Sequence, residues 1–320
     1  MNKMQKRGYW IFGVISLIVL SGCTSPRGVE DPQRYDYRTG SQGLELLFPV
    51  DTPTKLFEND QQIKFLVEIQ NRGAFPQFDE IGGLNGFIWV GGFDKSVIDL
   101  QPEQRQLDER ALEGKSEINR EGGYWAAVIS GRAFNLPSGT PYYRTPMIVT
   151  ATYNYETVAS ADICVDPEPR SPYVREKVCQ ITDFSNVVMS GSQGAPVAVT
   201  SIEEDATSTA LLFRIYVSNV GGGLLINEND ISFDPNRGYD WDELNQVRIA
   251  DVSVGNIPMT ECRPGIGEYL ELRNNRAFIF CRLATAGLDN AYRAPLNVRL
   301  AYGYASSVTR DIEIHREINY

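Results

Sequence analysis

The stretch Ile63-Lys-Phe-Leu-Val-Glu-Ile-Gln-Asn71-Arg-Gly73 carries the pattern that decides the fold. Apolar side chains occupy every second position from Ile63 to Ile69, and mostly polar side chains stand between them. A period of two is typical of a β-strand that buries one face. We expect the strand to end at Asn71, whose side chain can bond its own backbone, and Gly73 to take a positive φ.

The same pattern returns in the second half of the chain, and two further blocks return with it in the same order. In the strand block, the matching residues are Phe65, Val67, Ile69, Asn71 and Gly73 with Phe213, Ile215, Val217, Asn219 and Gly221. A tyrosine block, Tyr143-Arg-Thr-Pro146 with Val149, Tyr153 and Tyr155, matches Tyr292-Arg-Ala-Pro295 with Val298, Tyr302 and Tyr304. Gly40-Ser-Gln-Gly43 recurs as Gly191-Ser-Gln-Gly194. Ordered matches of this kind indicate two homologous copies of one unit.

These repeats predict an all-β fold of two tandem immunoglobulin-like β-sandwich domains. Each copy holds alternating segments rich in Val, Ile, Tyr and Phe, separated by Gly, Pro and Asn, and the chain has no long helical pattern. The expected domains span residues 40–168 and 190–320, and a proline-rich linker at 169–189 joins them. Residues 101–112 are the one stretch whose pattern allows a short polar helix.

The strand that ends in Asn71-Arg-Gly73, repeated at Asn219-Val-Gly221, resembles the "N-x-G" signature of CARDB-type and related immunoglobulin-like domains of prokaryotic surface proteins. The resemblance covers a few tens of residues in each copy. It implies adhesion, assembly or spacing at a cell surface, and it implies no catalysis.

The N-terminal segment predicts export. Lys3, Lys6 and Arg7 precede an apolar run at 9–20, and Leu20-Ser-Gly-Cys23 follows. This order is typical of a signal peptide, and its end resembles the lipobox of prokaryotic lipoproteins. The apolar run is shorter than the roughly 20 residues that a membrane span needs, which favours a lipobox over an uncleaved anchor or an ordinary cleaved signal.

We therefore expect a signal peptide at 1–22 and a lipid on Cys23, followed by a flexible tether at 23–39. The protein would then be anchored to a membrane on its extracytoplasmic side, at the cell surface or in a periplasm. Its expected partners are that membrane, through the lipid, and other envelope or surface proteins.

The cysteine count fits this location. With Cys23 set aside for the lipid, four remain: Cys164, Cys179, Cys262 and Cys281. Four cysteines allow three connectivities, and the local one, Cys164–Cys179 with Cys262–Cys281, is the simplest. An exported protein favours disulfides over free thiols, and a bond at Cys164 would hold the linker against the first domain.

The net charge of −11 disfavours nucleic acid as a partner and is compatible with cation binding. The densest acidic stretch supplies the candidate ligands of a calcium ion, namely Asp234, Asn236, Asp240 and Asp242. The stretch resembles an EF-hand-like loop, although Gly238 is one position early and the bidentate Glu is missing. The pattern therefore favours a solvated acidic loop over a Ca²⁺ site, and no other cofactor is expected.

One aromatic residue stands apart from the predicted strands. Trp241 lies in the polar acidic loop, so we expect it to be a surface ligand contact. Trp89 and Trp125 belong to apolar or strand-like segments, and the repeated tyrosines are expected to pack in the core.

Catalysis has little support in the sequence. His315 is the only histidine, which leaves no case for a histidine-based triad or a zinc centre. The sequence thus predicts a non-catalytic, lipid-anchored surface protein with a structural, adhesive or envelope-assembly role. The alternative is a glycan-binding module that uses Trp241 and a calcium-dependent acidic loop.

Overall fold

The computed structural model describes residues 36–77, 83–168, 177–181, 185–187, 193–231, 238–288 and 290–317. Within these ranges all regular structure is strand, apart from two short 3₁₀ turns, so the predicted all-β fold is confirmed. Residues Asp36–Tyr320 form one compact unit. The division into two domains at 168 and 190 stays a prediction.

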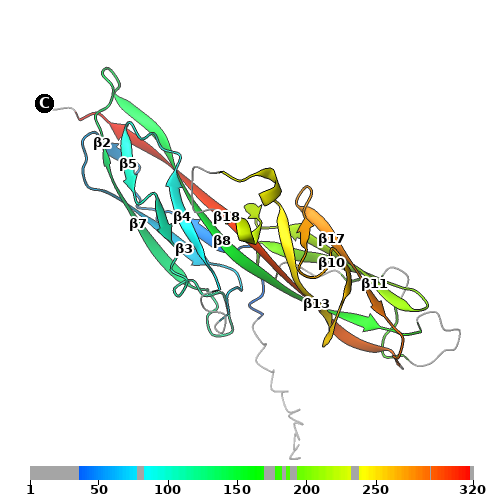
Figure 1. Ribbon diagram of the computed structural model, residues 1–320. Helices are drawn as coiled ribbons and strands as arrows, with labels where there is room; N and C mark the ends of the chain where they lie inside the picture. Colours follow the sequence, from blue (N-terminus) through cyan, green and yellow to red (C-terminus); the bar gives the residue numbers. More distant parts are fainter. Residues whose placement is uncertain are drawn as a thin grey trace, which may run out of the picture. The chain divides into compact units, whose positions relative to one another are not determined.

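The strands follow one another in two similar series (Figure 1). The first series is β1 (Leu44–Leu47), β2 (Lys55–Phe57), β3 (Ile63–Asn71), β4 (Gly86–Gly91), β5 (Ile98–Gln101), β6 (Gln104–Gln106), β7 (Tyr124–Ala133) and β8 (Tyr142–Val165). The second is β9 (Ser185–Val187), β10 (Val197–Ala206), β11 (Ala210–Asn219), β12 (Leu224–Ile226), β13 (Gln246–Val254), β14 (Ile257–Pro258), β15 (Glu261–Arg263), β16 (Tyr269–Glu271), β17 (Arg276–Ala284) and β18 (Tyr292–His315). The 3₁₀ turns η2 (Glu228–Asp230) and η3 (Trp241–Glu243) lie between β12 and β13.

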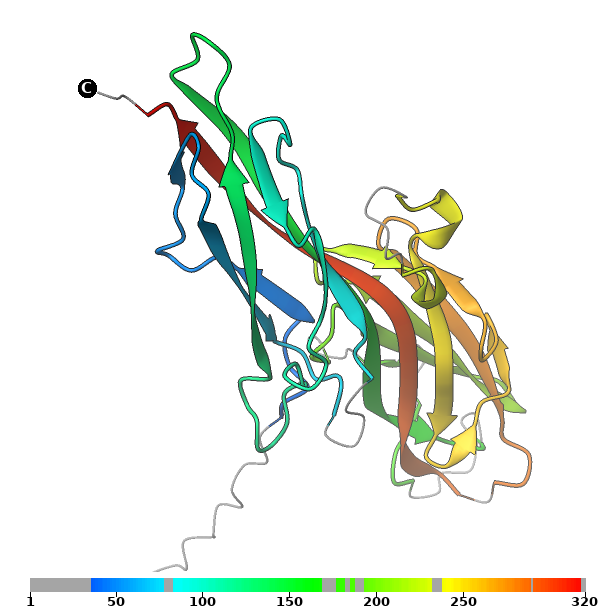
Figure 2. The same cartoon turned by 60° about the vertical axis from the view of Figure 1, so that its left-hand side comes forward.

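These strands form three sheets. A four-stranded sheet has the order β1-β3-β7-β5, and a five-stranded sheet has the order β15-β17-β11-β10-β9. Both pack on the third sheet, in which β8 and β18 are the central strands (Figures 1 and 2). The buried residues of the three layers make one continuous hydrophobic core.

The two long strands β8 and β18 pair with each other over their entire length, antiparallel and without a bulge. Tyr153 lies opposite Tyr304, and Tyr155 lies opposite Tyr302. Since Tyr153 and Tyr155 are the repeat equivalents of Tyr302 and Tyr304, a local two-fold axis passes between Asn154 and Gly303, which also face each other. The repeats are therefore related by this axis where they meet.

Each long strand serves both repeats. The first half of β8 pairs with β4 of its own repeat, whereas its second half packs on β10 of the other repeat, where Thr157 Oγ1 donates to the Val197 carbonyl at 2.6 Å. The first half of β18 pairs with β13 of its own repeat, and its end runs parallel to β2 of the first. Each repeat thus donates half of its last strand to the other (Figure 2).

The alternation of buried and exposed side chains explains why β8 and β18 can each pack with both repeats. In β8 every second side chain is buried along nearly the whole strand, first beneath the four-stranded sheet and then beneath the five-stranded sheet. Small residues such as Ala151, Ala159 and Ala161 recur on this face. A strand with one continuous apolar face can extend past the edge of one layer and be covered by the next.

The cysteines have the local connectivity. Cys164 is bonded to Cys179 and Cys262 to Cys281, with S–S distances of 2.13 and 2.02 Å. The second bond joins neighbouring residues of β15 and β17. The first ties Cys179 to β8, the last strand of the first repeat, on the half of that strand that packs with the second repeat.

Two local expectations are also wrong. Residues 101–112 hold no helix; they begin at the end of β5 and contain β6, which pairs with β4. Gly73 and Gly221 do not have a positive φ. Both positions require glycine because neighbouring atoms, among them a tyrosine hydroxyl in each repeat, lie too close for a Cβ.

Cys23 and the signal segment lie outside the described residues. Among the described residues, no helix is long and apolar enough to cross a membrane. The two disulfides fit a protein that folds outside the cytoplasm.

Candidate functional site

The residues that both repeats share meet in the core around four buried tyrosines. Tyr153, Tyr155, Tyr302 and Tyr304 are each at most 1 % exposed. Their rings form a closed set of contacts with centroid distances between 5.9 and 6.3 Å. Burial raises the pKa of all four hydroxyls above the usual value for tyrosine. The expectation that they are core residues is confirmed.

The hydroxyls near the two-fold axis bond across the repeats. The Leu44 N–H donates to the Tyr153 hydroxyl at 2.9 Å, and Ser306 Oγ of the other long strand lies 3.1 Å from the same oxygen. The second repeat has the same arrangement in the equivalent residues, with the Tyr302 hydroxyl bonded to Val197 N–H (3.3 Å) and to Thr157 Oγ1 (2.8 Å).

The N-x-G asparagines hold the other two hydroxyls. Asn71 is fully buried, and its amide donates to the carbonyls of Phe75 (2.7 Å) and Leu112 (2.9 Å). Its Oδ1 accepts from Gly73 N–H and from the Tyr155 hydroxyl, at 3.1 and 3.2 Å. In the second repeat, Asn219 Oδ1 accepts from the Tyr304 hydroxyl at 3.0 Å. The Asn219 amide donates to the Gly223 carbonyl, also at 3.0 Å.

These contacts explain the glycines of the motif. A Cβ on Gly73 would lie 1.9 Å from the Tyr155 hydroxyl and 2.5 Å from the Gly194 carbonyl. A Cβ on Gly221 would lie 2.6 Å from the Tyr304 hydroxyl. Pro196 Cβ would lie at 2.5 Å from the Gly221 Cβ as well, so close approach of the tyrosine and of neighbouring atoms, and not backbone conformation, excludes a side chain at both positions.

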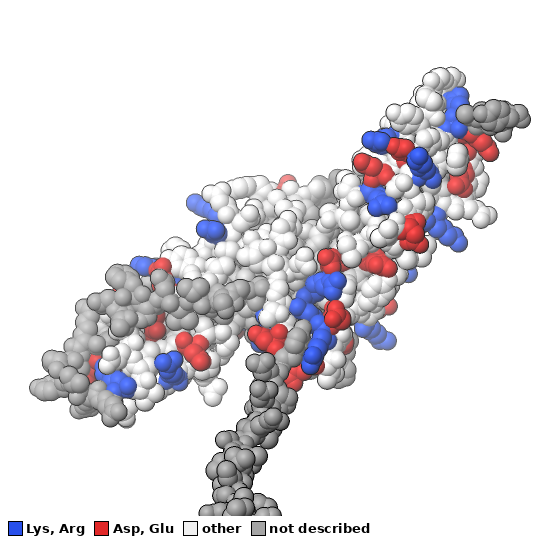
Figure 3. All heavy atoms as spheres, turned by 180° about the vertical axis from the view of Figure 1, so that it is seen from behind, with Lys and Arg blue, Asp and Glu red and all other residues white. Residues whose placement is uncertain are grey.

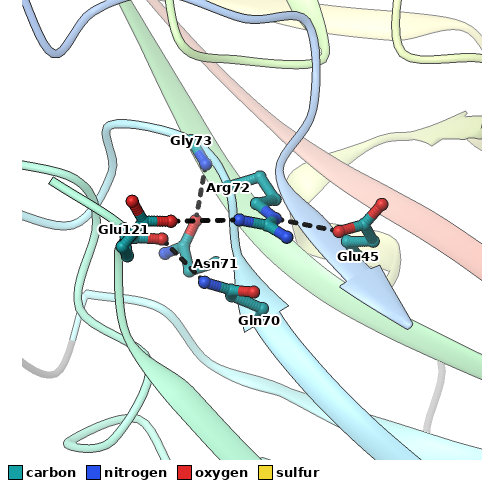
Figure 4. A network of polar contacts seen from close by, with 6 residues as sticks. All are labelled: Glu45, Gln70, Asn71, Arg72, Gly73 and Glu121. Atoms are coloured by element: carbon teal, nitrogen blue, oxygen red, sulfur yellow. Dashed lines mark hydrogen bonds and ion pairs between the residues drawn. The ribbon is translucent and has the colours of Figure 1, made fainter. Parts of the chain in front are cut away.

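Polar residues around the motif complete this structural network (Figure 4). Arg72 donates to a Glu45 carboxylate oxygen at 2.9 Å and lies 3.5 Å from Glu121. The Gln70 amide donates to the Glu121 carbonyl at 2.9 Å. Because nearly every polar group here bonds within the chain, the network holds strands together and offers no free group for chemistry.

A groove beside Trp241 lies at the surface, in contrast to the buried tyrosine network. It has a volume of about 430 Å³ and lies between the segment from η3 to the start of β13 and the hairpin from β16 to β17. Its lining residues are Trp241, Asp242, Leu244, Asn245, Gln246, Glu271, Leu272, Arg273 and Asn274. Trp241 is 80 % exposed, so the structure places the predicted ligand contact at the mouth of a groove.

Local backbone geometry fixes both walls of the groove. Asn274 and Asn275 have φ values of 53° and 64°, and Arg273 and Arg276 exchange backbone hydrogen bonds around them. This is the geometry of a two-residue hairpin turn with both central residues left-handed, a conformation that Asn tolerates. On the opposite wall Asn245 has a φ of 59°, and its backbone bonds to Leu225 and Leu272.

Sequence reasoning missed the second wall of this groove. The signal was present as Arg273-Asn-Asn-Arg276, because two asparagines between strand-like segments are typical of such a turn. No local sequence pattern indicates that β16 pairs with β13, and this pairing brings Glu271 opposite Gln246.

The calcium hypothesis gains no support. Asp234 and Asn236 lie outside the described residues. Asp240 is exposed, and its backbone N–H donates to Glu243 Oε2 at 2.9 Å. Among the described residues no three His, Cys, Asp or Glu side chains are grouped so that they could hold a metal ion.

Trp89 and Trp125, the other tryptophans that the structure describes, are held in the fold. Trp89 is 9 % exposed within β4. Trp125 is half-buried, with the guanidinium of Arg105 lying 5.0 Å from its ring centre. His315 lies at the end of β18, stacked on Tyr142 and 3.2 Å from a Glu313 oxygen. These contacts account for the three side chains without a ligand.

One buried acid stands out from the described carboxyl groups. Glu204 is 2 % exposed on β10, and its Oε1 has no hydrogen-bond partner within the described part of the chain. Burial raises its pKa to about 7, an effect only partly opposed by the backbone N–H of Cys164. Among the described residues, no second acid or base side chain is bonded to it.

The surface charge of the described residues is mixed. On the face drawn in Figure 3, Lys and Arg side chains alternate with Asp and Glu side chains. Many charged side chains of the described residues are paired, such as Arg214 with Glu203 at 3.2 Å and Arg282 with Glu261 at 2.7 Å. The described residues drawn on this face form no extended basic surface of the kind that binds nucleic acid.

Comparisons with known proteins identify no family. No family model matches the chain, and no curated protein matches it. Among solved structures, the E. coli chaperone DraB aligns over 75 % of this chain and 86 % of its own, with 8 % identity and a TM-score of 0.19. A structure described as BspA_C_WT aligns over 85 % and 99 %, with 8 % identity and a TM-score of 0.14. At these scores neither similarity bears on fold or function.

Proposed function

We propose that this chain is a non-catalytic protein that a lipid on Cys23 anchors on the extracytoplasmic side of a membrane. There it acts as a structural or adhesive module that contacts other envelope proteins. The observation that carries the proposal is the reciprocal exchange of β8 and β18, which makes the two repeats into one unit. A unit with two halves fixed by a continuous strand pair can transmit position or force, as a spacer or assembly subunit must.

The chemistry of the described residues supports a binding role over a catalytic one. The tyrosines and asparagines that the two repeats share form one network, in which their hydroxyls and amides bond to backbone groups of the same chain. The two disulfides favour an oxidising compartment. The lipobox resemblance of residues 20–23 supplies the anchor.

The outer face of the four-stranded sheet offers a contact surface. Leu66 and Val128 lie directly opposite each other on β3 and β7, and both are exposed. Leu47 on β1 is exposed on the neighbouring strand. Exposed apolar residues that adjoin on one face of a sheet are suited to a protein partner.

The first test is the intact mass of the protein extracted from its native membrane in detergent, without reductant. A chain that begins at Cys23, heavier by a lipid and lighter by four hydrogens, supports the anchor and both disulfides. A Cys23→Ala variant should then leave the membrane fraction. A mass that includes residues 1–22 would remove the lipoprotein premise.

The partner is tested by a photo-crosslinking residue in place of Leu66, in cells that make the full chain. We expect a crosslink to an envelope protein or to a second copy. The same residue in place of Ile118, which is 89 % exposed in a loop, is the matched control. Equal crosslinking at both positions would argue against this face as the contact surface.

A further inference from the structure

We propose that the groove beside Trp241 binds a neutral oligosaccharide, without a metal ion. This goes beyond the anchoring and assembly role, and it does not depend on that role. The volume of the groove, about 430 Å³, lies in the range of small-molecule sites, roughly 300–1,000 Å³.

The aromatic residue has the exposure that a sugar platform needs. An indole that is 80 % exposed leaves an apolar surface in water. A core role is excluded by that exposure, and the short 3₁₀ turn η3, with Glu243 N–H bonded to the Asp240 carbonyl at 3.1 Å, holds the residue in place. One face of a pyranose ring presents C–H groups, which pack on such an indole while the hydroxyls point outward.

Polar side chains that could bond those hydroxyls line the groove beside Trp241. The side chains of Asp242, Asn245 and Asn274 make no hydrogen bond within the described part of the chain, although all three line the groove. A carboxamide has donors and an acceptor on one plane, and a carboxylate has acceptors only. Together they can bond adjacent sugar hydroxyls, each of which both donates and accepts.

The fixed backbone on both sides lowers the cost of binding. Asn245 and Asn274 are held in left-handed conformations by their turns, and Gln246 is fixed by bonds to the Asp242 carbonyl and the Asn227 amide. Groups that are already positioned lose little freedom when a ligand arrives.

The charges of the groove select a neutral ligand. Asp242 and Glu271 carry negative charge, and Arg273 carries positive charge that it shares with Glu271 at 3.3 Å. The net negative balance opposes uronic or sialic acids and phosphorylated ligands. A peptide would need apolar pockets, whereas the only aliphatic residues that line the groove are the half-buried Leu244 and Leu272, which is 3 % exposed.

The test uses the full chain and a microarray of neutral hexose and N-acetylhexosamine oligomers, followed by titration of the best oligomer. We expect saturable binding that EDTA does not change and that Trp241→Ala weakens at least about tenfold, the loss of one central aromatic contact. Phe278→Ala, which removes an exposed aromatic residue of β17 that does not line the groove, is the matched control and should bind as the wild type does.

A measurement on the unaltered protein protects the test against a misfolded variant. N-bromosuccinimide oxidises exposed tryptophan, and peptide mass spectrometry locates the product. The bound oligomer should protect Trp241 at least severalfold. Binding restricted to acidic glycans, no binding to any neutral oligomer, or full oxidation of Trp241 at saturating oligomer would overturn the proposal.

Discussion

The hydroxyl of Tyr153 lies 3.1 Å from Oγ of Ser306, and this contact joins the last strand of one repeat to the last strand of the other. The equivalent pair, Tyr302 and Thr157, lies 2.8 Å apart on the other side of the two-fold axis. Both hydroxyls also bind a backbone N–H at the start of a strand in the facing sheet. The two repeats are therefore joined through a polar network inside the core as well as through the strand ladder.

Removal of the Tyr302 hydroxyl should destabilise the fold. In Tyr302→Phe the buried Val197 N–H and Thr157 hydroxyl lose a partner, which costs about 1–3 kcal/mol of unfolding free energy. Urea denaturation measures the change. Tyr142→Phe, at a position that is 53 % exposed, is the control and should change the free energy little. Equal effects of the two variants would show that the hydroxyl contributes nothing.

A methyl group at Gly73 should be poorly tolerated. Gly73→Ala brings Cβ against the Tyr155 hydroxyl and two backbone carbonyls, those of Gly194 and Gln42. Overpacking of this kind costs about 1–3 kcal/mol or more, and it should appear as a lower midpoint of thermal unfolding. Gly91→Ala is the matched control, because a Cβ there meets nothing within 4 Å. A Gly73→Ala protein as stable as Gly91→Ala would contradict the assigned role of glycine.

Stability should fall as pH rises, through Glu204. Its pKa is raised from 4.5 to about 7 by burial, so the folded state holds a proton that the unfolded state has already lost. Its contribution is therefore fully present below the unfolded pKa and is lost as pH rises through about 7. Urea midpoints from pH 5 to pH 8 should decline in the wild type and change less in Glu204→Gln. Identical profiles for both proteins would reject Glu204 as the source.

Loss of the Cys164–Cys179 bond should destabilise the second repeat more than the first. The bond closes a chain separation of 15 residues, worth about 3 kcal/mol in the chain-entropy model. Cys179 Sγ lies 3.4 Å from the Tyr292 carbonyl at the start of β18. In the Cys164→Ala, Cys179→Ala double variant, amide hydrogen exchange should increase first in β9, β10 and the first half of β18. An increase confined to β1 and β3 would place the bond's effect in the first repeat.

The sequence predicted the strands and the equivalence of the repeats, because alternation and ordered matches are local signals. It did not predict that β8 and β18 pair with each other. Equivalence tells which residues correspond, whereas pairing is decided by which apolar faces meet across the whole fold. The same limit applied to Gly73, whose neighbour Tyr155 is far away in sequence, and to the helix expected at 101–112, where pairing with β4 prevails over local polarity.

The candidate site could be predicted only in part. Trp241 was expected at the surface because a tryptophan in a polar loop is unusual, and it is 80 % exposed, whereas its contact with a ligand stays a prediction. The wall that contains Asn274 depends on how β16 and β13 meet, which no local pattern encodes. The lipid on Cys23 stays a prediction.

The exchanged strands bear on how this chain could have arisen. A gene that encoded one repeat would have produced a sandwich with half a strand protruding and half a strand missing, and a second copy related by two-fold symmetry would have supplied what was missing. Fusion of two such copies keeps that symmetry within one polypeptide and frees each half to diverge. Deletion of either copy from the present gene would therefore leave the other without a strand that it needs, so selection acts on the pair as a single heritable unit.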